Sequence, residues 1–240
     1  MSGSRSRLIA AYSRLRPIYA WTDRFRDRGL TVLLVLDLCL VFFAAPRASE
    51  GPPIVRALNE TMVLAVVAVV VLLSRRRDAI ATIVLGLIAI LASAWPGLAW
   101  PPAAVASVLR RGGDILIFSA LTWVVAHAVY APGRITSHRL QGAAVLYLSL
   151  ATIFASAFSL IWELNPSGFT GLPGLTRGPA ENATMMYFSL TTLTTTGYGD
   201  ITPLDPFARS LVNLESVLGQ FFLAITVARL VTLELQDRRR

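Results

Sequence analysis

The sequence contains no lysine, one cysteine and two histidines among its 240 residues, and only 15% of its residues are charged. A single cysteine, Cys39, excludes an internal disulfide, and the isolated His127 and His138 leave no ligand set for a metal cluster. No serine, histidine and aspartate form a catalytic set, and no glycine-rich loop suits a phosphate group. We therefore expect a protein that is not an enzyme and that holds no cofactor.

Apolar residues dominate the chain instead. Hydrophobic residues make up 55% of it, and the mean hydropathy is +0.61. A hydrocarbon core about 30 Å thick requires about 20 apolar residues of helix. Six runs meet or approach this length and predict six transmembrane helices: residues 30–45, 61–73 extended back to 54, 79–100, 115–130 extended back to 105, 142–164 and 207–235. The expected fold class is an all-α membrane protein.

All 22 basic residues are arginine, and the net charge is +8. The arginines form short clusters beside the apolar runs, which indicates membrane orientation and contact with anionic lipid rather than binding to nucleic acid. With six spans, most of them fall on the side that also holds both termini, and the positive-inside rule makes this side cytoplasmic. We expect a multi-pass protein of the cell membrane, and a bacterial inner membrane fits a short chain without a cleavable signal.

Three regions follow from this pattern. Residues 1–29 hold seven arginines and no long apolar run, which predicts a cytoplasmic amphipathic segment at the membrane interface. Its large residues fall on one helical face: Leu8, Tyr12, Leu15 and Tyr19. This segment is either a sensor of anionic lipid or a topology anchor. Residues 30–135 form a four-helix transmembrane domain, and residues 136–240 form a separate domain with the last two spans.

The last two runs enclose an unusual polar stretch, TLTTTGYGDITP at residues 192–203. A Gly/Pro-rich segment at residues 165–180 precedes it, and residues 181–194 can form a helix of only about three to four turns. Such a helix is too short to cross a membrane. A short helix and a glycine-containing loop between two spans predict a re-entrant loop, whose backbone is buried in protein or lines water.

The stretch TTTGYGD resembles the TVGYG selectivity filter of tetrameric potassium channels, in which rings of backbone carbonyls replace the hydration shell of the ion. The resemblance covers about residues 141–235. It implies a pore domain with an outer helix, a pore helix, a filter and an inner helix, and K⁺ as the permeant ion. The implied K⁺-binding residues are Thr195, Thr196, Gly197, Tyr198 and Gly199, with the Thr195 hydroxyl at the inner mouth. Carbonyls that all point one way need alternating backbone hands, and positive φ costs little only at Gly197 and Gly199. Because one chain supplies one row of carbonyls, the family implies a homotetramer.

Residues around the motif have implied supporting roles. Thr194 and Asp200 would brace the row of carbonyls, and Tyr187 stands where the family often has a tryptophan that donates to the aspartate. Gly219, 22 positions after Gly197, stands where the family has a glycine that lets the inner helix bend. Close contact between helices is the other explanation of this glycine.

The motif also departs from the family. Thr196 replaces the usual valine and adds a hydroxyl behind the row, Phe188 offers no donor, and Thr191 stands where some members carry a buried glutamate. We therefore expect a different supporting shell around the filter. Glu215 is expected to contact the rear of the filter or a neighbouring helix rather than ions.

The fourth run does not have the repeated arginines of a voltage sensor. Its adjacent Arg110 and Arg111 lie on different helix faces, and Asp114 is close enough to neutralise one of them. Asp37 in the first run could also pair with them, and an ionisable group in a membrane helix is a functional candidate. Steep voltage dependence is not expected.

Three functions remain open from the sequence. The first is a passive potassium-selective channel. The second is a cation channel with relaxed selectivity, which Thr196 would explain. The third is a potassium-binding subunit of a transport system that does not conduct alone.

Overall fold

The computed structural model describes residues 29–44, 47, 53–73, 77–93, 102–130, 137–172 and 174–238. Residues 1–28, which carry most of the predicted amphipathic segment, lie outside this description. The described elements are a helix over Gly29–Ala44 that ends in the π-helical η1 (Leu40–Ala44), α3 (Pro53–Leu73), α4 (Arg77–Ser93), α5 (Ala103–Val129), α6 (Ser137–Leu164), the 3-10 turn η2 (Pro166–Gly168), β1 (Phe169–Thr170), α7 (Pro179–Leu193), β2 (Thr202–Pro203) and α8 (Pro206–Arg238).

Each of the six predicted apolar runs overlaps one of these helices. Within the described ranges, three helices are long and apolar enough to cross a membrane: Ala103–Val129, His138–Leu164 and Pro206–Arg229. The apolar parts of Gly29–Ala44 and Thr61–Val71 are shorter, and α4 has 17 residues. The described chain is therefore mostly helical with three membrane-length helices, as expected of an all-α membrane protein. The total of six spans stays a prediction.

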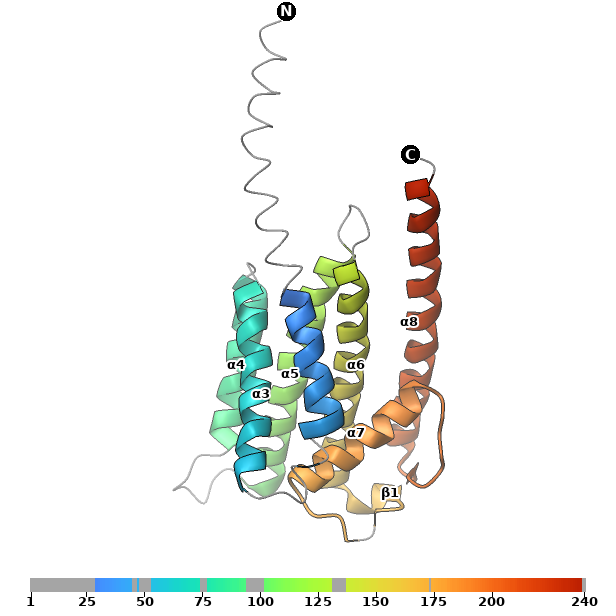
Figure 1. The fold of residues 1–240 in the computed structure, drawn as a ribbon. Coiled ribbons are helices and arrows are strands. Elements are labelled where there is room, and N and C mark those ends of the chain that lie inside the picture. The colour runs from blue at the N-terminus through green and yellow to red at the C-terminus, as the bar shows by residue number, and fades with distance from the viewer. Residues whose placement is uncertain are drawn as a thin grey trace, which may run out of the picture.

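The first five described helices stand side by side as a bundle (Figure 1). Their shared core contains Leu33, Val66, Ile83, Leu121 and Val145, all at most 1% exposed. Two glycines bring α4 and α5 unusually close. A Cβ on Gly86 would lie 2.8 Å from the carbonyl oxygen of Gly113, and a Cβ on Gly113 would lie 2.6 Å from that of Gly86. Small residues permit such backbone contact between membrane helices, so these two helices form one unit.

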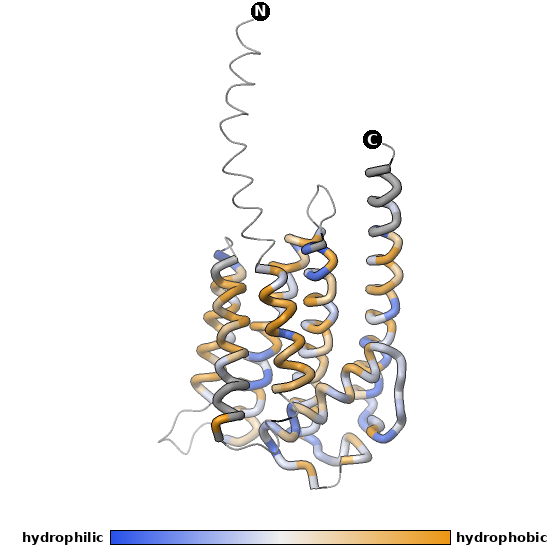
Figure 2. Tube along the Cα trace, in the orientation of Figure 1, coloured by the Kyte–Doolittle hydropathy of each residue, from blue (hydrophilic) through white to orange (hydrophobic). Residues whose placement is uncertain are grey.

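The helix α7 slants across one end of the bundle, and α8 stands beside the bundle (Figure 1). Only 11% of the most apolar 18-residue stretch of α8 is buried within the chain. Much of α8 is hydrophobic in Figure 2, and its exposed apolar residues include Phe221, Leu223, Ile225 and Val227. At the end far from α7, the Arg229 guanidinium donates to the carbonyl oxygen of Tyr130, with Nη2 2.9 Å away, and lies 4.7 Å from the Tyr130 ring centroid.

A second core lies where α6 meets α7. Its centre is aromatic: the ring centroids of Phe158 and Phe188 are 5.0 Å apart, and those of Phe169 and Phe188 are 5.8 Å apart, in edge-to-face geometry. Aromatic pairs favour this arrangement because the ring edge is positive and its face negative. Phe188, which has no hydrogen-bond donor, thus packs in the core that holds α7 in place.

Candidate functional site

The segment Thr194–Asp200, here called the GYG loop, begins directly at the C-terminal end of α7 (Figure 1). Helix α7 has 15 residues, two more at its start than the sequence predicted, because Pro179 occupies the first turn where its missing N–H costs nothing. The chain then leaves the helix by a tight turn in which the N–H groups of Thr196 and Gly197 donate to one acceptor, the Thr191 carbonyl oxygen, at 2.8 and 3.1 Å.

The backbone of the GYG loop alternates in hand. Thr195, Gly197 and Gly199 have positive φ values of 57°, 52° and 79°, whereas Thr196 and Tyr198 between them do not. This alternation is the one expected of a row of carbonyls that point to one side. Positive φ costs little for glycine but about 1–3 kcal/mol for another residue. The sequence indicated the two glycines, but it gave no reason to expect a β-branched threonine in this conformation.

The threonine hydroxyls of the loop are held by neighbouring groups. The Thr194 and Thr196 Oγ1 atoms lie 2.9 Å apart, and the Thr194 hydroxyl donates to the Leu190 carbonyl oxygen at 2.7 Å. The added hydroxyl of Thr196 therefore has a partner on the same loop. Between these two threonines, the Thr195 hydroxyl accepts a hydrogen bond from the side-chain amide of Gln220 in α8.

Tyr187 lies beside the far end of the loop. Its hydroxyl donates to Asp200 Oδ2 at 2.8 Å, and its ring stacks on that of Tyr198, with centroids 6.3 Å apart and planes 2° apart. The hydrogen bond to the Asp200 carboxylate raises the pKa of the Tyr187 hydroxyl. The donor therefore stays protonated throughout the neutral range. The resemblance to potassium channels predicted such a hydrogen bond to Asp200 from Tyr187. Its effect on an ion site stays a prediction.

Helix α8 packs against the C-terminal half of α7. A Cβ on Gly219 would collide with the carbonyl oxygen of Leu193, the last residue of α7. Close approach thus requires glycine here, and the predicted bend of α8 at this residue stays a prediction. Four residues earlier, Glu215 is 0% exposed and hydrogen-bonded to the Ser189 hydroxyl, while its second oxygen has no partner among the described residues. Glu215 therefore contacts α7, as expected from the sequence.

A two-stranded pairing of β1 with β2 holds the chain beyond the loop. Gly171 has a φ of 82°, and a Cβ there would collide with the Asp200 carbonyl oxygen, so the segment before α7 rests directly on the end of the loop. The Asp205 carboxylate accepts from the N–H groups of Phe207 and Ala208 at 2.8 and 3.0 Å and caps α8. The loop is thus fixed at both ends.

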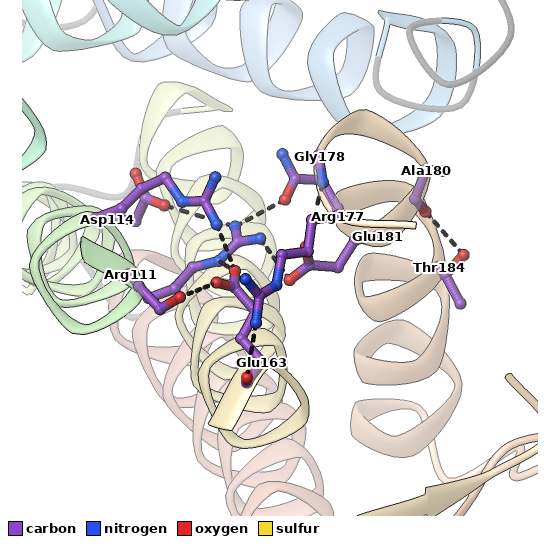
Figure 3. Close-up of polar contacts among 11 residues, drawn as sticks. Arg111, Asp114, Glu163, Arg177, Gly178, Ala180, Glu181 and Thr184 are labelled. Carbon is purple, nitrogen blue, oxygen red and sulfur yellow. Dashed lines mark hydrogen bonds and ion pairs between the residues drawn. The ribbon is translucent and has the colours of Figure 1, made fainter. Parts of the chain in front are cut away.

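A buried ion-pair cluster connects α5 to α6 and α7, and Figure 3 shows Arg111 between Glu163 and Glu181. The Arg111 side chain is 5% exposed and both glutamate side chains are 0% exposed. The cluster consists of Ser107, Arg110, Arg111, Asp114, Glu163, Glu181 and Asn182. The sequence indicated the two arginines and Asp114 but not the two glutamates or Asn182.

Asp37 is not part of this cluster. It is 3% exposed, its Oδ2 has no hydrogen-bond partner, and it forms no ion pair with Arg110 or Arg111 in the described part of the chain. The suggested pairing of Asp37 with the α5 arginines is therefore wrong. The physical reason is that Glu163 and Glu181, from helices that the sequence did not place beside α5, already occupy both guanidinium groups.

No group of three or more histidine, cysteine, aspartate or glutamate side chains in the described ranges has the arrangement of a metal site. The groups that can face an ion at the GYG loop are instead backbone carbonyls and threonine hydroxyls. These are hard oxygen donors without a fixed charge, which suit a weakly hydrated cation.

Comparisons with known proteins agree with this geometry. Residues 142–235, from the first turns of α6 to the last turns of α8, match a family model described as "Ion channel". Neither curated proteins nor solved structures include a significant match to the chain. The family match favours a protein that transports ions rather than an enzyme. Residues 142–235, with the GYG loop between their two long helices, are thus similar to the ion-channel family.

Proposed function

We propose that the protein is a potassium-selective channel that conducts K⁺ passively as a homotetramer. The observation that carries the proposal is the alternating hand of the GYG loop, with positive φ at Thr195, Gly197 and Gly199, directly after the end of α7. In this proposal the GYG loop is the selectivity filter and α7 is the pore helix. The carbonyls of Thr195, Thr196, Gly197 and Tyr198 bind the ion, with Gly199 at the end of the row.

Electrostatics supports a cation at the start of the row. The C-terminal end of a helix carries about half a negative elementary charge, because its last carbonyls have no partner within the helix. Helix α7 ends at Leu193, two residues before Thr195. Four such helix ends around one axis would favour a cation at the centre and would disfavour an anion.

The exposed face of α8 supports assembly into a tetramer. Phe221 and Ile225 are 60% and 58% exposed in the single chain, so this apolar face of α8 is available for contact with a neighbouring copy. One chain supplies one row of oxygen ligands, and an ion needs ligands on all sides. Four copies around the axis satisfy this requirement.

The proposed placement in the cell follows from the arginine distribution. We infer six spans in a cell membrane, both termini in the cytoplasm, and the GYG loop toward the outer side. Contact of the arginine-rich residues 1–29 with anionic lipid is part of the same proposal. The four-helix domain of residues 30–135 and the pore domain of residues 136–240 are its two membrane units.

The test is the reversal potential of the purified protein in planar bilayers, with K⁺ on one side and Na⁺ on the other. The proposal predicts a reversal close to the K⁺ equilibrium potential, and the loss of this selectivity in Gly197→Ala. Gly197 has a φ of 52°, and alanine disfavours positive φ because of its Cβ, so this substitution should strain the loop. Reversal near zero in the wild type would instead favour the weakly selective cation channel.

The Thr196 hydroxyl is the specific observation behind this second candidate, since it places a polar group where the family has an apolar one. A third outcome is K⁺ binding by the purified protein without current at any voltage. That outcome favours a potassium-binding subunit of a transport system over a channel that conducts alone.

A further inference from the structure

We propose that Arg111 is a positioning residue for the GYG loop, because it ties the first turn of α7 to α5 and α6. Through this residue the four-helix domain acts on ion binding at the loop. The outer end of α5 then serves as a fixed support rather than a moving voltage sensor. The inference rests on the proposed function, because it takes the GYG loop to be the selectivity filter.

The contacts of Arg111 use its whole guanidinium group. Nε donates to Glu163 Oε1 at 2.8 Å, Nη2 donates to Glu181 Oε1 at 2.5 Å, and Nη1 donates to Asn182 Oδ1 at 2.7 Å. Nη1 also lies 3.8 Å from Asp114 Oδ2. A planar guanidinium with five donors can connect three helices at once in a way that a lysine ammonium cannot.

Glu181 is the critical partner, because it serves both the cluster and α7. Its Oε2 accepts from the Gly178 N–H at 3.2 Å and so closes the first turn of α7, while its Oε1 accepts from Arg111. Gly178 has a φ of 112°, a backbone conformation that suits the sharp entry into the helix. Arg111 is thus joined to the residue that fixes where and at what angle α7 begins (Figure 3).

Helix α7 transmits this position to the loop. It has 15 residues and is therefore about 22 Å long, at about 1.5 Å per residue. Its last turn supplies the Thr191 carbonyl oxygen that accepts from Thr196 and Gly197, and its middle supplies the Tyr187 hydroxyl that donates to Asp200. A tilt at the first turn would therefore displace the groups that hold both ends of the GYG loop.

Arg110 provides a natural contrast. It lies on the same turn of α5, its Nη2 donates to Glu163 Oε1 at 2.6 Å, and its side chain is 37% exposed. Glu163 belongs to α6, so this contact connects α5 to the outer helix without involving α7. Loss of Arg110 removes a positive charge beside Glu163 and leaves the link to α7 in place.

The experiment measures K⁺ and Na⁺ affinity of the purified tetramer by isothermal titration calorimetry, which does not require an open channel. The double variant Arg111→Gln/Glu181→Gln removes one positive and one negative charge together, so no unpaired buried charge replaces the pair. Glutamine at residue 181 still offers a carbonyl to the Gly178 N–H. We expect the ratio of K⁺ to Na⁺ affinity to fall by about two- to thirtyfold, the range of long-range coupling between sites.

Arg110→Gln is the matched control and should keep the wild-type ratio. Thermal unfolding and tetramer assembly are measured in parallel, since a merely structural cluster would lower stability without changing ion preference. If the double variant does not assemble, Glu181→Gln and Asn182→Ala each remove one part of the link and give the same comparison.

Two results separate this inference from the proposed function. A wild-type protein without preference for K⁺ overturns the proposed function. A wild-type protein with that preference, and assembled variants that keep it unchanged, overturn the role of Arg111 alone. A fall of the ratio in Arg110→Gln as large as in the double variant would also contradict it, because Arg110 contacts Glu163 of α6 and makes no contact with α7 among the described residues.

Discussion

The side-chain amide of Gln220 donates a hydrogen bond to the hydroxyl of Thr195, with Nε2 and Oγ1 3.1 Å apart. These residues belong to different elements, α8 and the GYG loop, and Thr195 has a positive φ. The bond orients the hydroxyl that, in the proposed channel, faces the ion at the inner mouth. Gln220 therefore helps to hold a threonine in a conformation that its branched side chain disfavours.

Substitution Gln220→Leu should weaken binding at this inner position. Ba²⁺ has nearly the size of K⁺ and twice its charge, so block of the current by Ba²⁺ from the inner side measures this site. We expect the dissociation constant for block to rise about two- to tenfold, for a net hydrogen bond of about 0.5–1.5 kcal/mol. Ser210→Ala is the control, because the Ser210 hydroxyl bonds within α8, to the Pro206 carbonyl oxygen, and not to the GYG loop in the described part of the chain. Equal block in both variants would exclude this role of Gln220.

Substitution Thr196→Val should leave the reversal potential unchanged. The Thr196 hydroxyl bonds to the Thr194 hydroxyl, and Thr194 keeps its own bond to the Leu190 carbonyl oxygen when Thr196 is replaced. Valine fills about the same volume and is the usual residue at this position in the potassium-channel filters that the loop resembles. Bi-ionic reversal potentials of the two proteins decide the point. A shift toward the K⁺ equilibrium value in the variant would mean that the threonine relaxes selectivity in the wild type.

Substitution Tyr187→Phe removes the donor to Asp200 and retains the ring that stacks on Tyr198. We expect the current of this variant to inactivate severalfold faster than the wild-type current at constant voltage, because Asp200 loses its hydrogen bond to residue 187. Because the bond to Asp200 raises the Tyr187 pKa, its contribution is fully present below the usual tyrosine pKa of about 10. It is lost only as pH rises through the raised value. The rate at which the wild-type current declines should therefore be the same at neutral and mildly alkaline pH. A second change, Phe188→Tyr, should not restore the slower decline in Tyr187→Phe, because Phe188 packs in the aromatic core.

Substitution Glu215→Ala should destabilise the protein by roughly 2–4 kcal/mol, because it leaves a cavity and removes the partner of Ser189. Glu215→Gln keeps the shape and the hydrogen bond and should cost much less. The thermal unfolding of both tetramers in the same detergent gives the comparison. Similar losses in the two variants would show that the carboxyl group itself, and not its volume and hydrogen bond, is required.

The conductance should depend only weakly on voltage. One elementary charge that crosses the membrane field gains about 2.3 kcal/mol per 100 mV, which corresponds to an e-fold change per about 25 mV. Arg111 is buried and bonded to Glu163, Glu181 and Asn182, so we expect a slope shallower than this value. The slope is measured from the conductance at voltages between about −100 and about +100 mV. A steeper slope would require movement of α5 and would contradict the fixed support.

Local patterns were sufficient to predict the helices and the GYG loop, because apolar runs and glycines act through nearby residues. Gly197 and Gly199 have the predicted positive φ, and the short helix before them is α7. The ion-pair cluster could not be predicted in this way, since Arg111 is separated by 52 residues from Glu163 and by 70 from Glu181. The positive φ of Thr195 was not predicted either, because contacts with α8 and α7 outweigh the preference of threonine for negative φ.

The contact between Gly86 and Gly113 has a mechanical consequence for the four-helix domain. Each glycine faces the main-chain carbonyl of the other helix, and neither position has room for a Cβ. A shift of α5 by one turn would bring Leu109 or Ile117 opposite Gly86, and both side chains would collide with the α4 backbone. The two helices therefore keep a single register. A displacement of α5 that reaches α7 is therefore expected to carry α4 with it and not to slide α5 along α4.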